Sequence, residues 1–361
     1  MLDRRILDLL KIELPIIQAP MAGFVTTAMV VAVSEAGGLG SFPCALVNAG
    51  QIRAELNSIR RQTSRPINLN FFCHSTPKFD AERERTWRER LASCYVELGL
   101  DPTAPVPSSS RTAFDSEMCE IVEEFRPQVV SFHFGLPDQD LVSRVKATGA
   151  KVLCSATTVQ EARWLDDHGC DAIIAQGSEA GGHQGMFLTL NTSVQLGTMS
   201  LLPQVVDAVK LPVIAAGGIT DARGMVAAFA LGACAVQLGT AYLFCPEATV
   251  SALHRAALKD ARNRETALTN VFTGRPARGF VNRLMREVGP MSDLAPQFPL
   301  AAGAIGPIRA RAEAKGSSDF TPLWSGQSAF AGRELPAGEL TRRLATEMLD
   351  LQNRIMRSAA P

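Results

Sequence analysis

The chain has 361 residues, 46% of them hydrophobic, which is long enough for one large α/β domain or two ordinary ones. Lys and Arg together number 36, as do Asp and Glu, so no net field favours nucleic acid or an anionic membrane. A small or weakly charged ligand is the better expectation.

The eight cysteines include no C-x-x-C pair, and several lie in apolar runs, so we expect reduced thiols in a cytoplasmic protein. The segment MLDRRILDLL places acids among its apolar residues, which is unlike a signal peptide. No uncharged run approaches the roughly 20 residues that span a bilayer, so we expect no membrane segment. The five histidines lack the spacing of chelating pairs, so we expect no metal site.

Eight short apolar runs recur along the chain, and stretches with helical spacing lie between them. The predicted strands cover residues 15–19, 39–42, 66–72, 128–133, 151–155, 171–176, 212–216 and 234–238. Several are apolar almost throughout, as expected for strands buried on both faces. This alternation predicts the α/β class, and specifically a (β/α)8 TIM barrel.

Two regions interrupt the β-α rhythm. Residues 74–127 are polar with helical spacing, which predicts a helical insertion and a solvated loop after the third strand. Residues 247–263 also have helical spacing, and 264–321 are rich in Arg, Gly and Pro without strand-like alternation. Residues 1–245 and 322–361, which include a last helix over 341–357, are therefore predicted to form the barrel. Residues 246–321 are predicted to form a smaller, mainly helical cap or substrate subdomain over one mouth.

Polar or small residues follow several strands, and the active sites of such barrels lie at the C-terminal ends of the strands. Met21 and Ala22 follow the first strand and suit close approach to a flat ring. Asn70 lies near the end of the third strand, and His133 ends the fourth. The sixth leads through Gln176 into SEAGGH, a cluster of functional groups that predicts a site.

Glycine-rich turns follow the last two strands. Gly217 and Gly218 lead into a helix, where bare backbone N–H groups attract anions. The run Gln237, Leu238, Gly239 and Thr240 repeats this arrangement one unit later. The pattern predicts a phosphorylated cofactor or substrate, although the glycines could also serve only to permit tight turns.

Taken in order, these segments resemble a known family. IIQAPMAG, NFF at 70–72, VVSFHFGLP, AQGSEAGGHQG, AAGGI and QLGT together are similar to class I nitronate monooxygenases, formerly 2-nitropropane dioxygenases. The resemblance covers residues 15–245 and continues weakly through LWSGQ at 323–327. It implies an FMN enzyme that oxidises alkyl nitronates, such as propionate 3-nitronate, with O₂ to carbonyl compounds and nitrite.

The same resemblance implies roles for individual residues. FMN would rest on Met21 and Ala22, with Asn70 and Gln176 reaching its ring or ribityl chain. Its phosphate would be held by backbone around Gly181, Gly217, Gly218, Gln237, Leu238, Gly239 and Thr240. His183 would be the catalytic histidine, with His133 beside it, because an imidazole can stabilise an anionic nitronate or accept a proton from the parent nitroalkane.

Some features depart from the family pattern or leave alternatives open. Gln184 stands where many relatives have Arg, and His254, Phe298 or Arg309 would replace the tyrosines that often line the substrate pocket. Glu179 is compatible with a loop-fixing salt bridge or a catalytic role. Three other functions remain open: an NAD(P)H-using reductase of the enoyl-acyl-carrier-protein or quinone type, a flavin barrel without turnover, and a phosphosugar barrel. The expected partners are a small nitronate and O₂ rather than nucleic acid or membrane, with the chain a monomer or homodimer.

Overall fold

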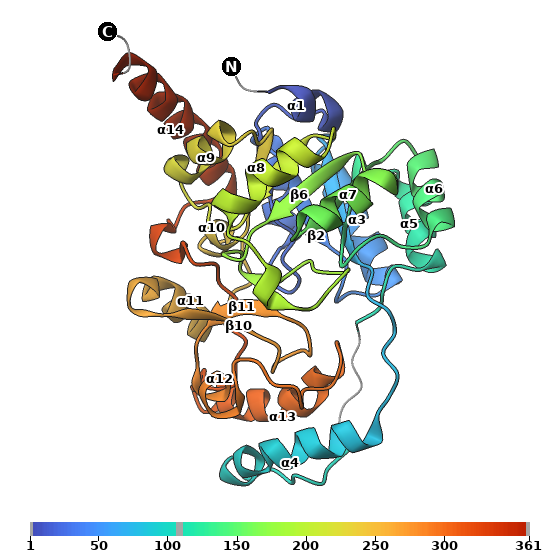
Figure 1. The fold of residues 1–361 in the computed structure, drawn as a ribbon, viewed down its shortest axis with the longest axis vertical. Coiled ribbons are helices and arrows are strands. Elements are labelled where there is room, and N and C mark those ends of the chain that lie inside the picture. The colour runs from blue at the N-terminus through green and yellow to red at the C-terminus, as the bar shows by residue number, and fades with distance from the viewer. Residues whose placement is uncertain (1–2, 106–110, 359–361) are drawn as a thin grey trace.

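Eight parallel strands form the centre of the computed structural model, which describes residues 3–105 and 111–358 (Figure 1). Their order around the sheet is β1-β9-β8-β6-β5-β4-β3-β2. A parallel bridge between Ile17 and Leu39 joins β1 to β2 and closes the barrel. The strands are β1 (Ile16–Gln18), β2 (Gly40–Pro43), β3 (Ile67–Phe72), β4 (Val129–His133), β5 (Lys151–Ala156), β6 (Ala172–Gln176), β8 (Val213–Ala216) and β9 (Ala235–Leu238). All eight predicted strands are confirmed.

Helices surround the barrel and cover its outer face. They are α2 (Thr27–Glu35), α3 (Ala49–Gln62), α5 (Ser116–Phe125), α6 (Gln139–Ala147), α7 (Val159–Asp167), α8 (Thr198–Ala208), α9 (Ala222–Ala230) and α14 (Ala337–Ser358). Side-chain caps start several of them, including Asp221 on α9, which accepts a hydrogen bond from the Arg223 N–H. The short helix α1 (Arg5–Leu10) buries Ile6 and Leu10 with the inward-facing residues Ile17 and Leu39. It therefore covers the N-terminal mouth of the barrel.

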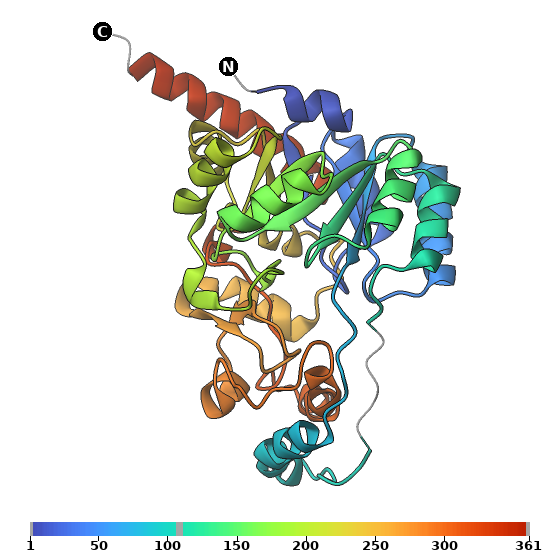
Figure 2. The same cartoon turned by 45° about the vertical axis from the view of Figure 1, so that its right-hand side comes forward.

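A second body, the cap, lies at the opposite end of the barrel from α1 (Figures 1 and 2). It contains α11 (Ala252–Lys259), β10 (Thr266–Thr269), β11 (Ala277–Phe280), α12 (Arg283–Val288) and α13 (Ala301–Ala314), with α10 (Thr240–Leu243) and the 3₁₀ turn η2 (Ala261–Asn263) leading into it. Helix α4 (Ala81–Glu97), from the insertion after β3, packs against α13. Trp87 and Leu91 of α4 share a buried cluster with Ile305 and Ile308.

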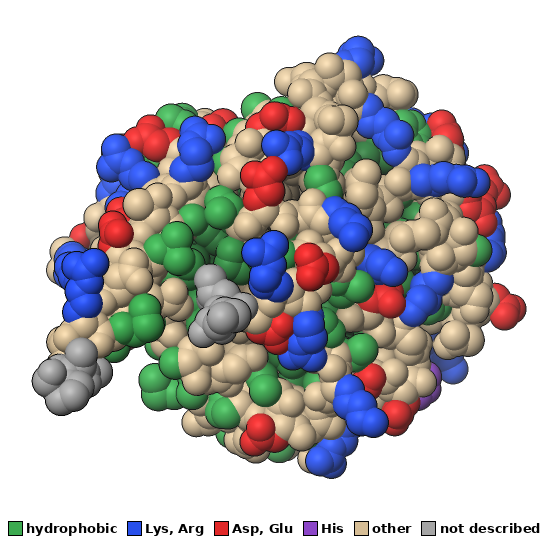
Figure 3. Space-filling model, turned by 90° about the horizontal axis from the view of Figure 1, so that it is seen from above, with side chains coloured by type: hydrophobic (Ala, Val, Ile, Leu, Met, Phe, Trp, Pro, Cys, Tyr) green, Lys and Arg blue, Asp and Glu red, His purple; other side chains and the backbone are tan. Residues whose placement is uncertain are grey.

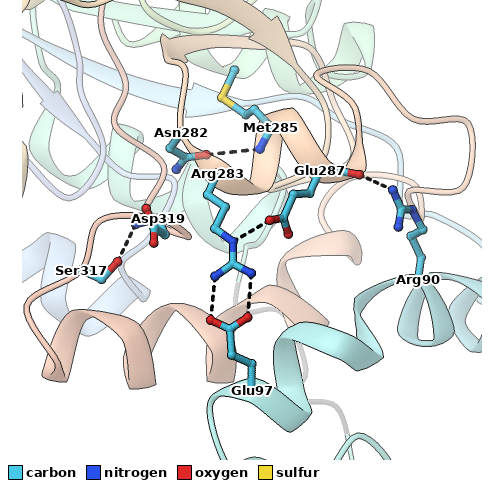
Figure 4. A network of polar contacts seen from close by, with 8 residues as sticks. All are labelled: Arg90, Glu97, Asn282, Arg283, Met285, Glu287, Ser317 and Asp319. Carbon is cyan, nitrogen blue, oxygen red and sulfur yellow. Dashed lines mark hydrogen bonds and ion pairs between the residues drawn. The ribbon is translucent and has the colours of Figure 1, made fainter.

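Polar contacts attach α4 to this cap as well (Figure 4). The Arg283 guanidinium on α12 donates two hydrogen bonds to the Glu97 carboxylate, at 2.7 and 2.6 Å, and one to Glu287 at 2.6 Å. Arg90 reaches from α4 to the backbone carbonyl of Glu287. Such exposed pairs contribute little free energy, so the apolar cluster stabilises the interface and the forked pair fixes its geometry.

Residues 264–321 lack strand-like alternation in the sequence, yet they contain two strands. β10 pairs with β11, and β11 pairs antiparallel with a two-residue strand, β7 (Gly182–His183), so the cap includes a three-stranded sheet. TALT and ARGF are only four residues each, which is too short to show alternation, and the third strand of their sheet lies about 90 residues away in the chain.

Charges of both signs are interspersed over the face that carries α1 and α14 (Figure 3). This distribution agrees with the equal numbers of basic and acidic residues. Within residues 3–105 and 111–358, no helix is both long and apolar enough to cross a membrane.

Candidate functional site

A pocket lies between the C-terminal ends of the barrel strands and the cap. Alternation along each strand explains what forms its floor. The inward-facing residues near the other end of the strands are Val129, Leu153, Ile174, Ile214 and Ala235. Residues two or four positions further along each strand point the same way and lie nearer the mouth. His133, Ser155, Gln176, Ala216 and Gln237 thus reach the floor of the pocket, beside Asn70.

The structure brings almost all predicted site residues to this pocket. Its lining includes His133, His183, Met21, Ala22, Asn70, Gln176, Gly181, Gly217, Gly218, Gln237, Gly239 and Thr240. Leu238 is the exception, because its side chain is buried on the outer face of the sheet among the helices. Only its backbone is placed to contribute to a site.

The two imidazoles are held in different ways. His133 Nε2 lies 3.1 Å from the backbone carbonyl of His183, and its Nδ1 lies 3.1 Å from Ser155 Oγ. Because a carbonyl only accepts, Nε2 of His133 is the donor, and both nitrogens are occupied. His183 is on β7, where it pairs with Ala277 of the cap, and its Nε2 lies 2.9 Å from Thr273 Oγ1. His133 therefore supports the strand that presents His183.

Gln176 and Asn70 are also engaged by their surroundings. Gln176 donates from Nε2 to the His183 carbonyl at 3.1 Å, and its Oε1 accepts from the Gly185 N–H at 2.6 Å. Asn70 donates from Nδ2 to Ser131 Oγ at 2.9 Å. The Gln176 side chain thus fixes the loop that carries His183, while the Asn70 amide oxygen makes no bond with a residue in the described part of the chain.

Electrostatics in the pocket keep both imidazoles neutral. Burial lowers the pKa of His133 to about 4. Burial, and next the positive charge of Arg111, lower the pKa of His183 well below its usual range. Arg111 is the one charged side chain among the described residues that line the pocket. Burial lowers its pKa to about 10, so it stays positive at neutral pH.

Aromatic rings close the pocket around His183. The ring centroids of Phe298 and Trp324 lie 5.4 and 5.6 Å from that of His183, and Phe72 lies at 6.2 Å. The Arg111 guanidinium lies 5.1 Å from the centre of the Phe298 ring. Of the three residues predicted to replace the family tyrosines, Phe298 is thus beside His183. His254 bonds the Trp324 carbonyl instead, and Arg309 pairs with Glu313 on the exposed side of α13.

Thr273, Arg111 and Trp324 are site residues that sequence reasoning missed. They lie in loops of the cap and the insertion, where no periodic pattern marks them. The sequence offered one usable signal for Arg111, namely a basic residue directly after a run of three serines.

The Glu179 carboxylate, left unassigned by the sequence, accepts hydrogen bonds from the backbone N–H of Thr198, at 2.8 and 2.9 Å, and from its hydroxyl at 2.9 Å. It therefore stabilises the N-terminus of α8, where a carboxylate also complements the helix dipole. The structure shows this capping contact rather than the salt bridge considered from the sequence.

The glycine turns leave space and backbone N–H groups on the pocket wall. Gly217 and Gly218 have φ of 108° and 68°, which favour glycine, and they precede the N-terminus of α9. Gly181 has another reason to be glycine, because a Cβ there would lie 2.4 Å from the Gly326 nitrogen. Gln237 Oε1 is buried on the wall and lacks a hydrogen-bond partner in the described residues. A flat polar ring with a phosphate fits these features, since it would fill the space and satisfy the amide.

Comparisons with known proteins agree with this site. The family model described as nitronate monooxygenase matches residues 3–347. A nitronate monooxygenase of Pseudomonas aeruginosa is 42% identical over 346 residues, which cover 95% of this chain and 99% of that protein. One of Paraburkholderia phytofirmans is also 42% identical, over 96% of this chain and 95% of that protein.

Solved structures give the same result. A structure described as nitroalkane oxidase from Streptomyces ansochromogenes superposes with a TM-score of 0.87 at 37% identity, covering 97% of this chain and 99% of that one. FabK from Thermotoga maritima superposes with a TM-score of 0.75 at 27% identity, covering 99% and 100%. The barrel, the pocket and the full-length matches agree, and the chain belongs to the nitronate monooxygenase family.

Proposed function

We propose that this protein oxidises alkyl nitronates with O₂ to carbonyl compounds and nitrite, using FMN. The observation that carries the proposal is the pocket itself, where the His183 imidazole and the Arg111 guanidinium both contact the Phe298 ring at the end of a barrel. A nitronate is a small planar anion, and an apolar pocket with one cation and one imidazole suits it.

We further propose that FMN lies along the wall formed by the glycine turns. Met21 and Ala22 would contact its ring system, with Asn70, Gln176 and Gln237 as polar neighbours. The backbone at Gly181, Gly217, Gly218, Leu238, Gly239 and Thr240 would surround the phosphate. When bound, FMN supplies the redox chemistry that connects the nitronate to O₂.

The residues of the chain would position the substrate and exclude water. Arg111 attracts the anion, and the rings of Phe72, Phe298 and Trp324 keep the pocket apolar, which strengthens that attraction. His183 contacts the substrate, and His133 holds its strand in place. We also propose that the protein is cytoplasmic, in agreement with the free cysteines of the described chain. We propose that it is a monomer or a homodimer.

The first experiment separates this function from its alternatives. Purified protein is mixed without oxygen with propionate 3-nitronate or with NADH, and the visible flavin spectrum is recorded; nitrite is then measured in air. We expect a spectral response to the nitronate and release of nitrite. Reduction by NADH alone would favour the reductase function suggested by the FabK likeness, and bound flavin without either response would favour a binding protein. Protein that carries no flavin would favour a phosphosugar barrel.

Replacing the imidazole tests the proposed catalytic residue. We predict that His183→Asn keeps bound flavin but lowers nitronate turnover by about 10²-fold, because it removes the ring that positions the substrate in the pocket. His168→Asn is the control, since His168 stacks on Trp164 at the end of α7, away from the pocket. Equal turnover in the two variants would exclude His183 from the mechanism.

A further inference from the structure

Backbone carbonyls fix the position of the ring proton in three of the five histidines. His133 Nε2 and His254 Nε2 lie 3.1 and 3.0 Å from carbonyl oxygens, whereas His168 Nδ1 lies 2.6 Å from the carbonyl of Trp164. A carbonyl only accepts, so the facing nitrogen carries the proton. In their neutral forms, His133 and His254 are therefore Nε2–H tautomers and His168 is an Nδ1–H tautomer.

His183 differs because its partner is a hydroxyl. Nε2 lies 2.9 Å from Thr273 Oγ1, and a hydroxyl both donates and accepts. The Thr273 hydroxyl donates in turn to the backbone carbonyl of Arg275, at 3.5 Å, near the upper limit for a hydrogen bond. If its single proton is used there, the hydroxyl accepts the Nε2–H of His183. Nδ1 of His183 then carries the lone pair, and it has no bond with a residue within 3–105 or 111–358.

The cap holds this pair rigidly. Thr273 lies in the turn between β10 and β11 and is 3% exposed. Gly274 follows it with φ of 89°, and a Cβ there would lie 2.1 Å from the Pro296 carbonyl oxygen, so the turn has little freedom. β11 also pairs with His183 through Ala277. The same small sheet thus fixes the ring and its hydroxyl partner.

We propose that Thr273 is a positioning residue that holds His183 as the Nε2–H tautomer, so that Nδ1 is the proton acceptor of the pocket. The inference rests on the proposed function and extends it to neutral nitroalkanes. Nδ1 takes the proton from the carbon that bears the nitro group, the electron pair of that C–H bond moves onto the nitro group, and a nitronate forms beside an imidazolium. Arg111 lies near enough to contribute a positive charge to the resulting anion.

The tautomer is measurable without turnover. We would label histidine with ¹⁵N in the flavin-loaded protein and record ring nitrogen shifts, with His133 and His254 as internal Nε2–H references and His168 as the Nδ1–H reference. We expect His183, assigned through its absence in His183→Asn, to match the Nε2–H references. Thr273→Ser should preserve this signal. In Thr273→Val an Nε2–H would be buried against a methyl group, so the proton should move to Nδ1.

Kinetics supply the second measurement, with nitroethane and its preformed nitronate as paired substrates. Thr273→Val should lower kcat/KM for nitroethane by about 10²-fold and change that for the nitronate by less than about threefold, because only the first needs a base. Thr321→Val is the matched control, since it deletes a buried hydroxyl of the cap whose partner is Glu313 of α13 rather than the turn that carries Thr273. Thr273→Ser should restore nitroethane oxidation.

Several results would overturn the proposal: an Nδ1–H signal in the wild type, an unchanged tautomer in Thr273→Val, an equal loss for both substrates, or no consumption of nitroethane by the wild type. Failure of the proposed function is a separate result. It would appear as absence of nitrite from the preformed nitronate with the tautomer signals as expected.

Discussion

Arg111 and His183 line the same pocket. One is a fixed positive charge, and the other is an imidazole whose pKa is lowered by burial and by that charge. The pair explains how an apolar pocket could attract an anion and still keep its histidine neutral and able to accept a proton. Phe298 contacts both groups and sets the spacing between them.

Removing the charge of Arg111 should separate binding of the anion from the rest of catalysis. We predict that Arg111→Met raises KM for nitronates by about tenfold to a hundredfold, the loss expected for one charge-assisted hydrogen bond. Met retains much of the apolar contact with Phe298, and KM for neutral nitroethane should change far less. Steady-state kinetics with nitroethane and with its preformed nitronate measure this difference in KM. A parallel rise in KM for both would assign Arg111 a packing role.

The residues at strand ends were predictable, and those in the cap were not. Asn70, His133 and Gln176 follow from strand periodicity, because each lies at or near the end of a run that is buried on both faces. Thr273 and Arg111 reach the pocket from loops whose paths depend on tertiary packing. Gln176 was placed correctly, but its observed contacts are with the loop that carries His183. The sequence therefore predicted where a side chain such as that of Gln176 lies more readily than which groups it bonds.

At the scale of elements, the β8–α9 turn combines two positive-φ glycines with a helix N-terminus. We predict that Gly218→Asp weakens flavin binding at least tenfold more than Gly218→Asn. Both side chains suffer the same backbone strain, but only Asp places a negative charge where the phosphate is proposed to lie. Dissociation constants from fluorescence titration would measure the ratio. Equal affinities in the two variants would place the phosphate elsewhere.

The β7–β11 pairing is the element that sequence patterns could not reveal. Two residues of a barrel loop pair with a four-residue strand of the cap, and neither segment is long enough to show alternation. The pairing nevertheless carries His183. It makes the cap part of the site, because any change in the β10–β11 turn moves the partner of the imidazole.

At the scale of the whole molecule, the barrel was predictable because its signal is repeated. Eight apolar runs alternate with helical stretches and support one another, and each agrees with the same closed sheet. The cap lacks such repetition, and it assembles from two parts of the chain, α4 from the insertion and α11–α13 from the segment after β9. Its core depends on contacts between residues about 200 positions apart, such as the hydrogen bond from Tyr95 to the Ala304 carbonyl.

Burial of several histidines in both parts makes the stability of the whole fold depend on pH. Burial lowers the pKa of His74, His133 and His254 to about 4 each, against an unfolded value of 6.5. Between pH 4 and 6.5 the unfolded chain therefore binds more protons than the folded one, so the free energy of unfolding rises with pH through this window.

We predict that the free energy of unfolding of the flavin-free protein falls as pH is lowered from 6.5 to 5. Each buried histidine contributes up to about 1.4 kcal/mol per pH unit. His254→Gln removes one such group while an amide N–H can still reach the Trp324 carbonyl, so the slope should decrease by about that amount. Urea denaturation at pH 5, 6 and 7 measures both slopes. Asp3, whose pKa is lowered to about 2 from 3.8, loses its contribution only at lower pH. A wild-type stability that is flat from pH 5 to 6.5 would show that these imidazoles are not held neutral by the fold.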